Sequence, residues 1–174
     1  GGADGWKVKV LGKSEEILTG KQVIVATGSS PRALPGADFD NKLILDNAGA
    51  LAIAEVPKRL GVIGAGVVGL ELGSVWRRLG AEVTILEALP DLLDAADEQI
   101  AKEASRAFAR QGLMIHTGVT ITKVTARKSV TVEYTDSAGG GQSATFDKLI
   151  VAIGRVANTR GLNAEGVGLK LDAG

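Results

Sequence analysis

The stretch Gly64-Ala65-Gly66-Val67-Val68-Gly69 has the G-x-G-x-x-G spacing of a phosphate-binding glycine loop. The spacing alone is weak evidence, but its context is specific. The apolar run 59–63 predicts a strand just before the loop, and the pattern over 67–79 predicts a helix just after it, with Gly80 well placed to end that helix. A strand, a glycine loop and a helix in this order are typical of the start of a dinucleotide-binding unit.

The three glycines of this loop meet three different physical needs. Gly64 permits the tight turn, Gly66 lets the backbone approach a pyrophosphate without a Cβ in the way, and Gly69 lets the helix pack close to the strand. The helix N-terminus then offers N–H groups and a partial positive charge of roughly half a unit to an anion. We therefore expect the loop to hold the pyrophosphate of a dinucleotide.

An acidic residue follows the next predicted strand. The run 81–87 ends in Glu87, at about the 20-residue spacing expected for a ribose-binding acid. A carboxylate there accepts hydrogen bonds from the adenosine hydroxyls and repels a 2′-phosphate. Residues 88–91 contain no Arg or Lys to offset that repulsion, so the sequence favours NAD over NADP. In the alternative, the glycines only form a turn and Glu87 is a solvated charge. That alternative does not explain why a strand, the loop, a helix, a second strand and an acid follow one another at the expected spacing.

The periodicity of apolar residues predicts the other elements. Alternation over 6–10 and a turn at 12–14 predict a hairpin whose return strand begins near 17–18. Two later strands and the region before Asp147 predict an antiparallel β-meander. The chain is thus expected to be α/β, a Rossmann-type dinucleotide-binding domain with a parallel sheet, helices and an antiparallel β-meander. The remaining predictions are helices over 48–55 and 97–111, strands over 114–117, 121–126, 130–135 and 147–154, and a hairpin turn at 139–141.

One pattern occurs twice. Lys21-Gln22-Val23-Ile24-Val25-Ala26-Thr27-Gly28 and Asp147-Lys148-Leu149-Ile150-Val151-Ala152-Ile153-Gly154 share an apolar-Ile-Val-Ala-x-Gly core, and each follows a predicted antiparallel hairpin. Both are interpreted as buried strands that run into a glycine turn. Two buried strands can look alike by chance. The favoured alternative is that the chain holds the last part of one dinucleotide unit and then all of a second.

Composition narrows the classes of protein further. The 174 residues include 20 basic and 20 acidic residues, so no charge excess favours nucleic acid or a membrane surface as a partner. No apolar run approaches the roughly 20 residues that span a bilayer. The absence of Cys excludes a disulfide, a thiolate nucleophile and a Cys-type zinc site within these residues, and no metal site is expected. His116, on a predicted strand, is interpreted as structural.

Three segments together resemble the dihydrolipoamide dehydrogenases, a group of flavin-dependent pyridine nucleotide-disulfide oxidoreductases. The first runs from Gly64 to Trp76 and continues over 79–84, and its most discriminating part is Gly73-Ser74-Val75-Trp76. The second, Ala26-Thr27-Gly28-Ser29-x-Pro31, resembles the box that ends the first part of the FAD domain in this group. The third, Gly154-Arg155-Val156-Ala157-Asn158-Thr159, resembles the box that follows the NAD domain.

The resemblance implies a division of the chain into three parts. Residues 1–36 would be the C-terminal remnant of the first half of a FAD-binding domain, 37–155 the NAD-binding Rossmann domain, and 156–174 a return segment toward the FAD domain. Ala157 stands where these proteins usually have Pro, so the turn after Arg155 is expected to be less rigid. Because the redox-active Cys pair and the His–Glu base of the group lie outside this region, no catalytic residue is expected in the chain.

The resemblance also implies which residues contact the cofactors. The adenosine ribose would bind Glu87, the adenine would lie near Val124, and the nicotinamide would lie near Glu71 and Gly154. For Glu71, stabilisation of the first helical turn is the alternative interpretation. The expected cofactor-binding residues are Gly64, Ala65, Gly66, Val67, Val68, Gly69, Leu70, Glu71, Glu87, Val124 and Gly154 for NAD, and Thr27, Gly28 and Ser29 for FAD.

The parent enzyme implied by the resemblance carries electrons from dihydrolipoamide through a disulfide and FAD to NAD+. Its partners would be NAD+/NADH, FAD, the lipoyl groups of a 2-oxo acid dehydrogenase complex and a homodimer partner. The chain alone is expected to be a monomeric fragment, cytoplasmic or, alternatively, from the mitochondrial matrix. Two other functions stay open: the NAD-binding part of another flavoprotein disulfide or peroxide reductase, and a non-catalytic NAD-sensing module.

Overall fold

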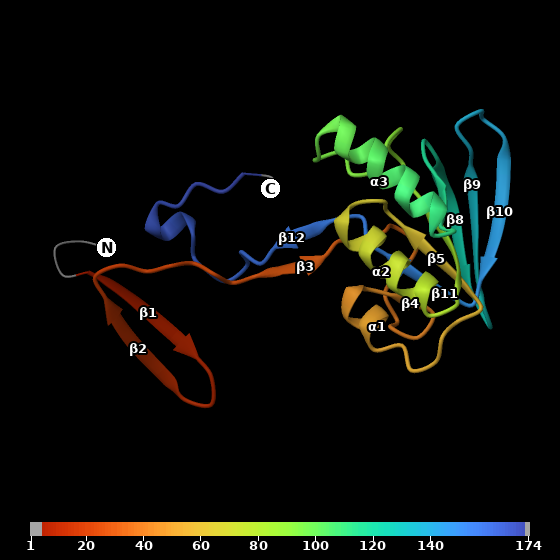
Figure 1. Cartoon of the computed structure of the whole chain (residues 1–174). Helices are drawn as coiled ribbons and strands as arrows, with labels where there is room; N and C mark the ends of the chain where they lie inside the picture. Colours follow the sequence, from red (N-terminus) through yellow and green to blue (C-terminus); the bar gives the residue numbers. More distant parts are fainter. Residues whose placement is uncertain (1–4, 173–174) are drawn as a thin grey trace. The chain divides into compact units, whose positions relative to one another are not determined.

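The computed structural model describes residues 5–172, which form two compact units. One unit, Pro31–Arg155, is continuous in sequence. The other combines the residues before Pro31 with those after Arg155. Figure 1 labels the elements of both units along the chain.

A five-stranded, all-parallel sheet forms the centre of the 31–155 unit. Its order is β4-β11-β5-β6-β7, so the strand before the glycine loop lies at the middle of the sheet. The predicted parallel sheet is therefore confirmed. Its strands are β4 (Ile44–Leu45), β5 (Arg59–Ile63), β6 (Glu82–Leu86), β7 (Met114–His116) and β11 (Lys148–Val151).

The helices of this unit begin and end at the signals that the sequence contains. The helix α2 (Val67–Arg78) is followed by Gly80 at φ +112°, a conformation that L side chains rarely adopt. The helix α3 (Glu98–Arg110) begins after Asp97, whose side chain accepts hydrogen bonds from two backbone N–H groups of the first turn. Both predicted helices are confirmed to within about two residues.

The first helix is shorter than predicted. The helix α1 (Asn47–Leu51) has the Asp46 carboxylate as its N-cap, with Gly49 N–H as the donor. It ends at Leu51, so the prediction of a helix over 48–55 is wrong for its second half. The residue before Pro57 is restricted to extended conformations, and the chain must straighten to enter β5.

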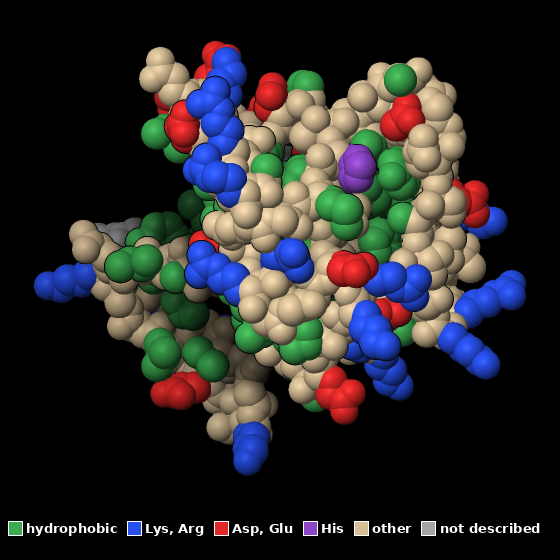
Figure 2. All heavy atoms as spheres, turned by 45° about the vertical axis from the view of Figure 1, so that its right-hand side comes forward, with side chains coloured by type: hydrophobic (Ala, Val, Ile, Leu, Met, Phe, Trp, Pro, Cys, Tyr) green, Lys and Arg blue, Asp and Glu red, His purple; other side chains and the backbone are tan. Residues whose placement is uncertain are grey.

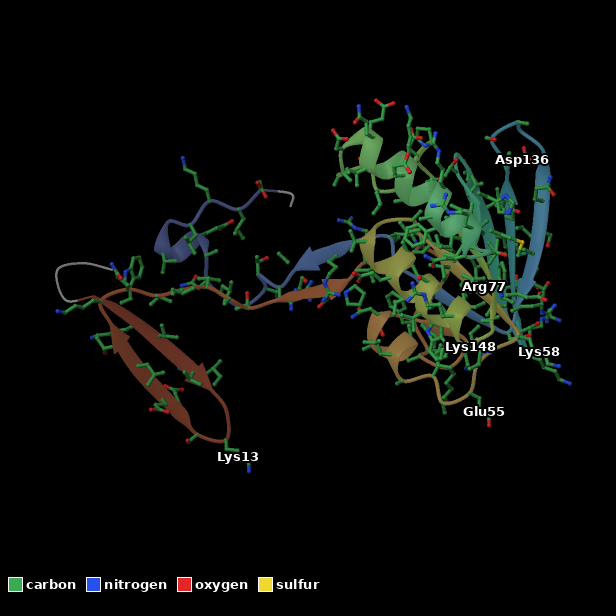
Figure 3. The ribbon with its side chains drawn as sticks, in the orientation of Figure 1. Lys13, Glu55, Lys58, Arg77, Asp136 and Lys148 are labelled. Atoms are coloured by element: carbon green, nitrogen blue, oxygen red, sulfur yellow. The ribbon has the colours of Figure 1, made fainter. Side chains whose placement is uncertain are left out.

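The antiparallel meander is confirmed as a three-stranded sheet of order β10-β9-β8, with bounds Thr120–Ala126 for β8, Val130–Thr135 for β9 and Gly141–Phe146 for β10. The β9–β10 turn contains two of the three predicted turn glycines, Gly139 and Gly140, whereas Gly141 begins β10. Asp136, labelled in Figure 3, accepts hydrogen bonds there from Ala138 N–H (3.0 Å) and Gly140 N–H (2.8 Å). The hydrogen bond from the Gln142 side chain, together with these two backbone bonds, lowers the pKa of the Asp136 carboxyl.

The parallel sheet is buried on both faces. Val62 belongs to a core cluster with Leu70 of α2 and partly buried residues of α3. Ile63, the next residue of β5, belongs to a second cluster with Phe146 of the meander. Helices therefore cover one face and the meander the other (Figure 1). Gly61 is required beneath the meander, because a Cβ there would lie 2.5 Å from the Phe146 ring.

The second unit begins with the predicted hairpin. The strands β1 (Trp6–Leu11) and β2 (Glu15–Gly20) pair antiparallel, and Lys13 lies in the turn between them (Figure 3). The strands β3 (Ser29–Pro31) and β12 (Arg155–Ala157) form a two-stranded sheet. A short 3-10 helix, η1, covers Glu165–Val167.

The predicted buried strand over 21–28 is wrong. These residues form no strand, and Val23, Ile24 and Val25 are 46%, 91% and 52% exposed. The physical reason is the lack of partners, because no strand among residues 5–172 pairs with this segment. An apolar extended segment becomes a strand only when neighbouring strands take up its N–H and C=O groups.

Charged side chains of both signs are interspersed over the face of the molecule drawn in Figure 2. Among residues 5–172, no helix is long and apolar enough to cross a membrane.

Candidate functional site

The glycine loop lies between β5 and α2, and its first glycine admits no side chain. Gly64 has φ +106°, and a Cβ there would lie 2.5 Å from the carbonyl oxygen of Ala152 at the end of β11. The Gly64 N–H donates to the carbonyl oxygen of Leu86 at the end of β6 (2.8 Å). The loop therefore turns where three neighbouring strands end.

The other two glycines of the loop have opposite surroundings. A Cβ on Gly69 would collide with the carbonyl oxygen of Gly64, so the helix packs against the loop only because this residue is glycine. A Cβ on Gly66 would meet nothing within 4 Å. Gly66 is also the N-cap of α2 and offers no side-chain acceptor to the N–H groups of the first turn. This arrangement leaves open space at the helix N-terminus, where an anion can approach.

The carboxylate of Glu87 is held against the loop by two backbone donors. Its Oε2 accepts from Ala65 N–H at 2.5 Å, and its Oε1 accepts from Leu89 N–H at 2.8 Å. The Glu87 N–H itself donates to His116 O at 2.8 Å, which ties the end of β6 to β7. Each carboxylate oxygen keeps further lone pairs, so the group can still accept hydrogen bonds from a ligand.

A residue with a rare backbone conformation completes this contact. Leu93 has φ +54°, and its N–H donates to the carbonyl oxygen of Ala65 at 3.1 Å. The peptide groups around Ala65 are thus bonded on one side to Glu87 and on the other to the 88–96 loop. This pairing fixes the glycine loop before any ligand binds.

A cavity of about 830 Å³ runs along the loop, within the range of volumes of small-molecule sites. It lies at the carboxyl ends of the parallel strands, where ligands bind in open α/β sheets. Glu87, Asp91 and Asp94 contribute acidic groups to its wall, and Arg155 is the one basic residue of the lining. The lining residues are Pro31, Leu34, Asn47, 63–68, 86–89, Asp91, 93–96, 119–121 and 151–155.

Another part of the cavity wall is formed around Gly154, which has φ +114°. The Gly154 carbonyl oxygen accepts from Arg32 N–H at 3.0 Å. The next residue, Arg155, donates from Nη1 to the side-chain oxygen of Asn47 at 3.1 Å. This part of the cavity wall is therefore fixed by residues from three separated parts of the sequence.

The structure brings some of the predicted site residues together and leaves others apart. The residues from Gly64 to Val68, with Glu87 and Gly154, line the cavity. Gly69 and Leu70 are buried in the packing beneath it. Glu71 is exposed on α2 and Val124 is half-buried on β8; neither lines the cavity, and their cofactor contacts stay predictions.

The three residues predicted near FAD lie in the other unit. Thr27 and Gly28 hydrogen-bond to Asn158, and Ser29 opens β3. His116 is exposed on β7, and its ring centroid lies 6.4 Å from that of Tyr134; its structural role stays a prediction.

Sequence reasoning missed several lining residues. The segment 151–153 could have been found, because it ends a strand at the same sheet edge as the glycine loop. Asn47 and Leu93 carried no signal: one opens a five-residue helix, and the other lies in a loop whose path depends on its contact with Ala65.

A glycine loop opening a helix, an acid at the end of the next strand and a cavity at the carboxyl ends of a parallel sheet define a dinucleotide-binding domain of the Rossmann type. Comparison with known proteins narrows this class. The profile of the pyridine nucleotide-disulphide oxidoreductase family matches residues 3–174, and the chain belongs to this family.

Individual relatives agree with this assignment. A dihydrolipoyl dehydrogenase of Cupriavidus necator is 56% identical over 171 residues, which are 98% of this chain and 35% of that protein. A mitochondrial dihydrolipoyl dehydrogenase of Pisum sativum is 40% identical over 158 residues, or 90% of this chain and 32% of that one. The crystal structure of LpdA from Mycobacterium tuberculosis superimposes with a TM-score of 0.83 at 31% identity, covering 95% of this chain and 36% of that one. The chain thus spans about a third of the length of these relatives.

Proposed function

We propose that the chain is the NAD-binding portion of a dihydrolipoyl dehydrogenase and that its 31–155 unit binds NAD+ along the glycine loop. The observation that carries this proposal is Glu87, whose carboxylate is held beside Ala65 in the lining of a cavity of about 830 Å³. The 56% identity to the Cupriavidus necator enzyme supports this choice within the family.

Different residues of the cavity bind different parts of the dinucleotide. The first turn of α2 offers N–H groups to the pyrophosphate, and the open space at Gly66 lets the phosphate oxygens come close. Glu87 accepts hydrogen bonds from the adenosine hydroxyls. A 2′-phosphate is disfavoured, because Asp91 and Asp94 add further negative charge to the same wall.

The other end of the cavity suits the nicotinamide. We place the nicotinamide near Gly154, where the positive φ and the absence of a side chain leave room for a flat ring. Glu71 is proposed to act toward the same end, and Val124 toward the adenine, as the family resemblance implies. These residues bind and orient the ring, while the hydride chemistry is that of the nicotinamide and of the flavin.

The unit that contains the hairpin, with its exposed segment 21–28, fits a flavin domain. We propose that 1–36 is the last part of the first half of a FAD-binding domain, that 37–155 is the NAD domain, and that 156–174 returns to the FAD domain. The exposed apolar residues of 21–28 support this, since they need partner strands. Thr27, Gly28 and Ser29 are the residues proposed to lie at FAD. The chain contains no Cys, so the disulfide step is assigned to other parts of the parent protein.

The proposed partners follow from the same assignment. The parent protein would act on the lipoyl groups of a 2-oxo acid dehydrogenase complex and pair with a second copy of itself, whereas we expect the isolated chain to sediment as a monomer. A cytoplasmic location is supported by the bacterial relative, and the Pisum sativum relative makes the mitochondrial matrix the alternative.

Titration of the chain with NADH and, separately, with NADPH tests the proposed function. Energy transfer from tryptophan (Trp6 and Trp76) to the reduced nicotinamide reports binding. We expect NADPH to bind at least about tenfold more weakly than NADH, which corresponds to about 1.4 kcal/mol. The Glu87→Ala variant should narrow this gap, because it removes the charge that repels the 2′-phosphate.

Glu82→Ala is the matched control, since Glu82 is exposed at the other end of the same strand β6. This variant should keep the preference for NADH. Equal affinity for both nucleotides in the unmodified chain would contradict the assigned role of Glu87. No binding of either nucleotide would show that the chain alone does not form the site.

A further inference from the structure

A single residue after the second repeat copy holds the end of the first copy. The backbone N–H of Asn158 donates to Gly28 O at 3.0 Å, and its carbonyl oxygen accepts from Thr27 Oγ1 at 2.6 Å. Its side-chain Nδ2 donates to Thr27 O at 3.1 Å, and its side-chain Oδ1 accepts from Ser30 Oγ at 2.7 Å. Both the backbone groups and the side-chain groups of Asn158 are therefore bonded to the segment 27–30.

The chemistry of this contact requires asparagine. An amide side chain offers a donor and an acceptor on the same carbon, and these match the carbonyl oxygen of Thr27 and the hydroxyl of Ser30. An aspartate would place a second acceptor against Thr27 O and lose that bond. A glutamine would displace the amide by one carbon. Gly28, with φ +74°, has room beside the amide, because an added Cβ would be 3.8 Å from Asn158 Nδ2.

The contact also spans a long stretch of sequence. Thr27 and Asn158 are 131 positions apart, and the whole 31–155 unit lies between them. The residues before the segment 27–30, namely 21–26, are exposed and form no strand. Asn158 and the short β3–β12 pairing therefore both tie the segment 27–30 to the rest of its unit.

We propose that Asn158 is a positioning residue that fixes the segment 27–30 in the conformation needed to contact the flavin. This inference rests on the proposed function, because that function places Thr27, Gly28 and Ser29 at FAD. Asn158 does not contact the flavin itself. It acts by engaging Thr27 and Gly28, so that the segment is already ordered when FAD binds and less entropy is lost on binding.

A segment-exchange protein provides the main test. In it, this chain replaces the matching third of the Cupriavidus necator dihydrolipoyl dehydrogenase, with which it shares 56% identity. The readouts are the flavin absorbance retained per chain, the flavin dissociation constant and the NADH dissociation constant. Asn158→Ala should weaken flavin binding by about tenfold, the equivalent of one or two lost hydrogen bonds, while NADH affinity stays within about twofold.

Two graded variants and one control sharpen this test. Asn158→Asp keeps the bond from Ser30 but loses the donor to Thr27 O, and Ser30→Ala removes the hydroxyl that donates to Asn158 Oδ1, so both should give smaller losses. Arg160→Ala, an exposed change two residues further on, should leave flavin binding unchanged. If Asn158→Ala binds flavin as tightly as the unmodified exchange protein does, the proposal is overturned. A parallel loss of flavin binding and NADH binding would also overturn it, because it indicates general unfolding.

Failure of the proposed NAD-binding function can be distinguished from failure of the role proposed for Asn158. If the unmodified exchange protein binds flavin but no NADH, the NAD site is wrong, and the comparison of flavin binding between Asn158 variants still decides the role of Asn158. If the exchange protein does not fold, hydrogen exchange on the 174-residue chain decides it. Asn158→Ala should then speed deuterium uptake in 26–33 and leave β5 and β6 unchanged, and unaltered uptake in 26–33 would reject the proposal.

Discussion

The two copies of the repeated pattern end in different structures. In the copy 147–154, the strand β11 lies between β4 and β5, and Leu149, Ile150 and Val151 are at most 1% exposed. In the copy 21–28, no strand forms, and Ile24, which matches Ile150, is 91% exposed. Both copies nevertheless end in a glycine with positive φ, +74° at Gly28 and +114° at Gly154.

This difference separates the ability of a segment to form a buried strand from the presence of the partners that bury it. The apolar run makes both segments able to be buried strands, but only the second copy has strands on both sides and packed layers above and below. Hydrogen bonding to neighbours and removal of apolar surface from water are both required for a strand, and both come from other parts of the chain.

Truncation of the matched isoleucines tests the comparison most directly. Ile150→Ala should lower the free energy of unfolding by about 2–5 kcal/mol, because it leaves a cavity in a close-packed core. Ile24→Ala should change it by no more than about 0.5 kcal/mol, as at other exposed positions. Urea denaturation followed by circular dichroism measures both. Equal losses would mean that 21–28 is buried in solution.

The matched terminal glycines should differ less. Gly154→Ala and Gly28→Ala both place a Cβ in an unfavourable backbone region, at a cost of about 1–2 kcal/mol each. Gly154→Ala should cost more, because φ +114° lies further from the left-handed helical region than φ +74°. It should also weaken NADH binding, since Gly154 lines the cavity. Gly141→Ala is the control, because Gly141 has open space and no positive φ. A stronger effect of Gly28→Ala on NADH affinity would reverse the proposed roles.

Substitutions at the first residue of each copy, Lys21 and Asp147, should change the free energy of unfolding least. The Arg59 side chain, with the Arg59 backbone N–H, holds the pKa of the Asp147 carboxyl below its ordinary value. A lowered folded-state pKa stabilises the fold above the unfolded pKa of about 3.9, and this stabilisation is lost as the pH falls through the folded pKa.

Asp147→Asn should therefore lower the free energy of unfolding at pH 7 by less than about 1 kcal/mol, because the ion pair is well exposed and screened by solvent. The difference from the unmodified chain should shrink in acid. Lys21→Gln, at the matching position of the first copy, should have no effect at either pH. A deficit of Asp147→Asn that persists at pH 2 would show that the contribution is not one of charge.

Much of the fold followed from local patterns. The glycine loop, the helix after it, Asp97 as a cap and the turn glycines of the meander were all predicted, because each depends on residues within a few positions of one another. The helix over 48–55 was predicted too long, since the approach to Pro57 and β5 ended it early. The strand over 21–28 failed because its burial depends on segments that do not pair with it here.

The sequence by itself determined the βαβ unit, the α/β class and the presence of an acid about 20 residues after the loop, because periodicity and spacing act over short distances. Only the tertiary structure decided that Glu87 bonds to Ala65, that Leu93 bonds to the same residue, and that Asn158 reaches Thr27. These contacts join residues from 22 to 131 positions apart. Contacts of that kind depend on the packing of whole elements, which no local pattern specifies.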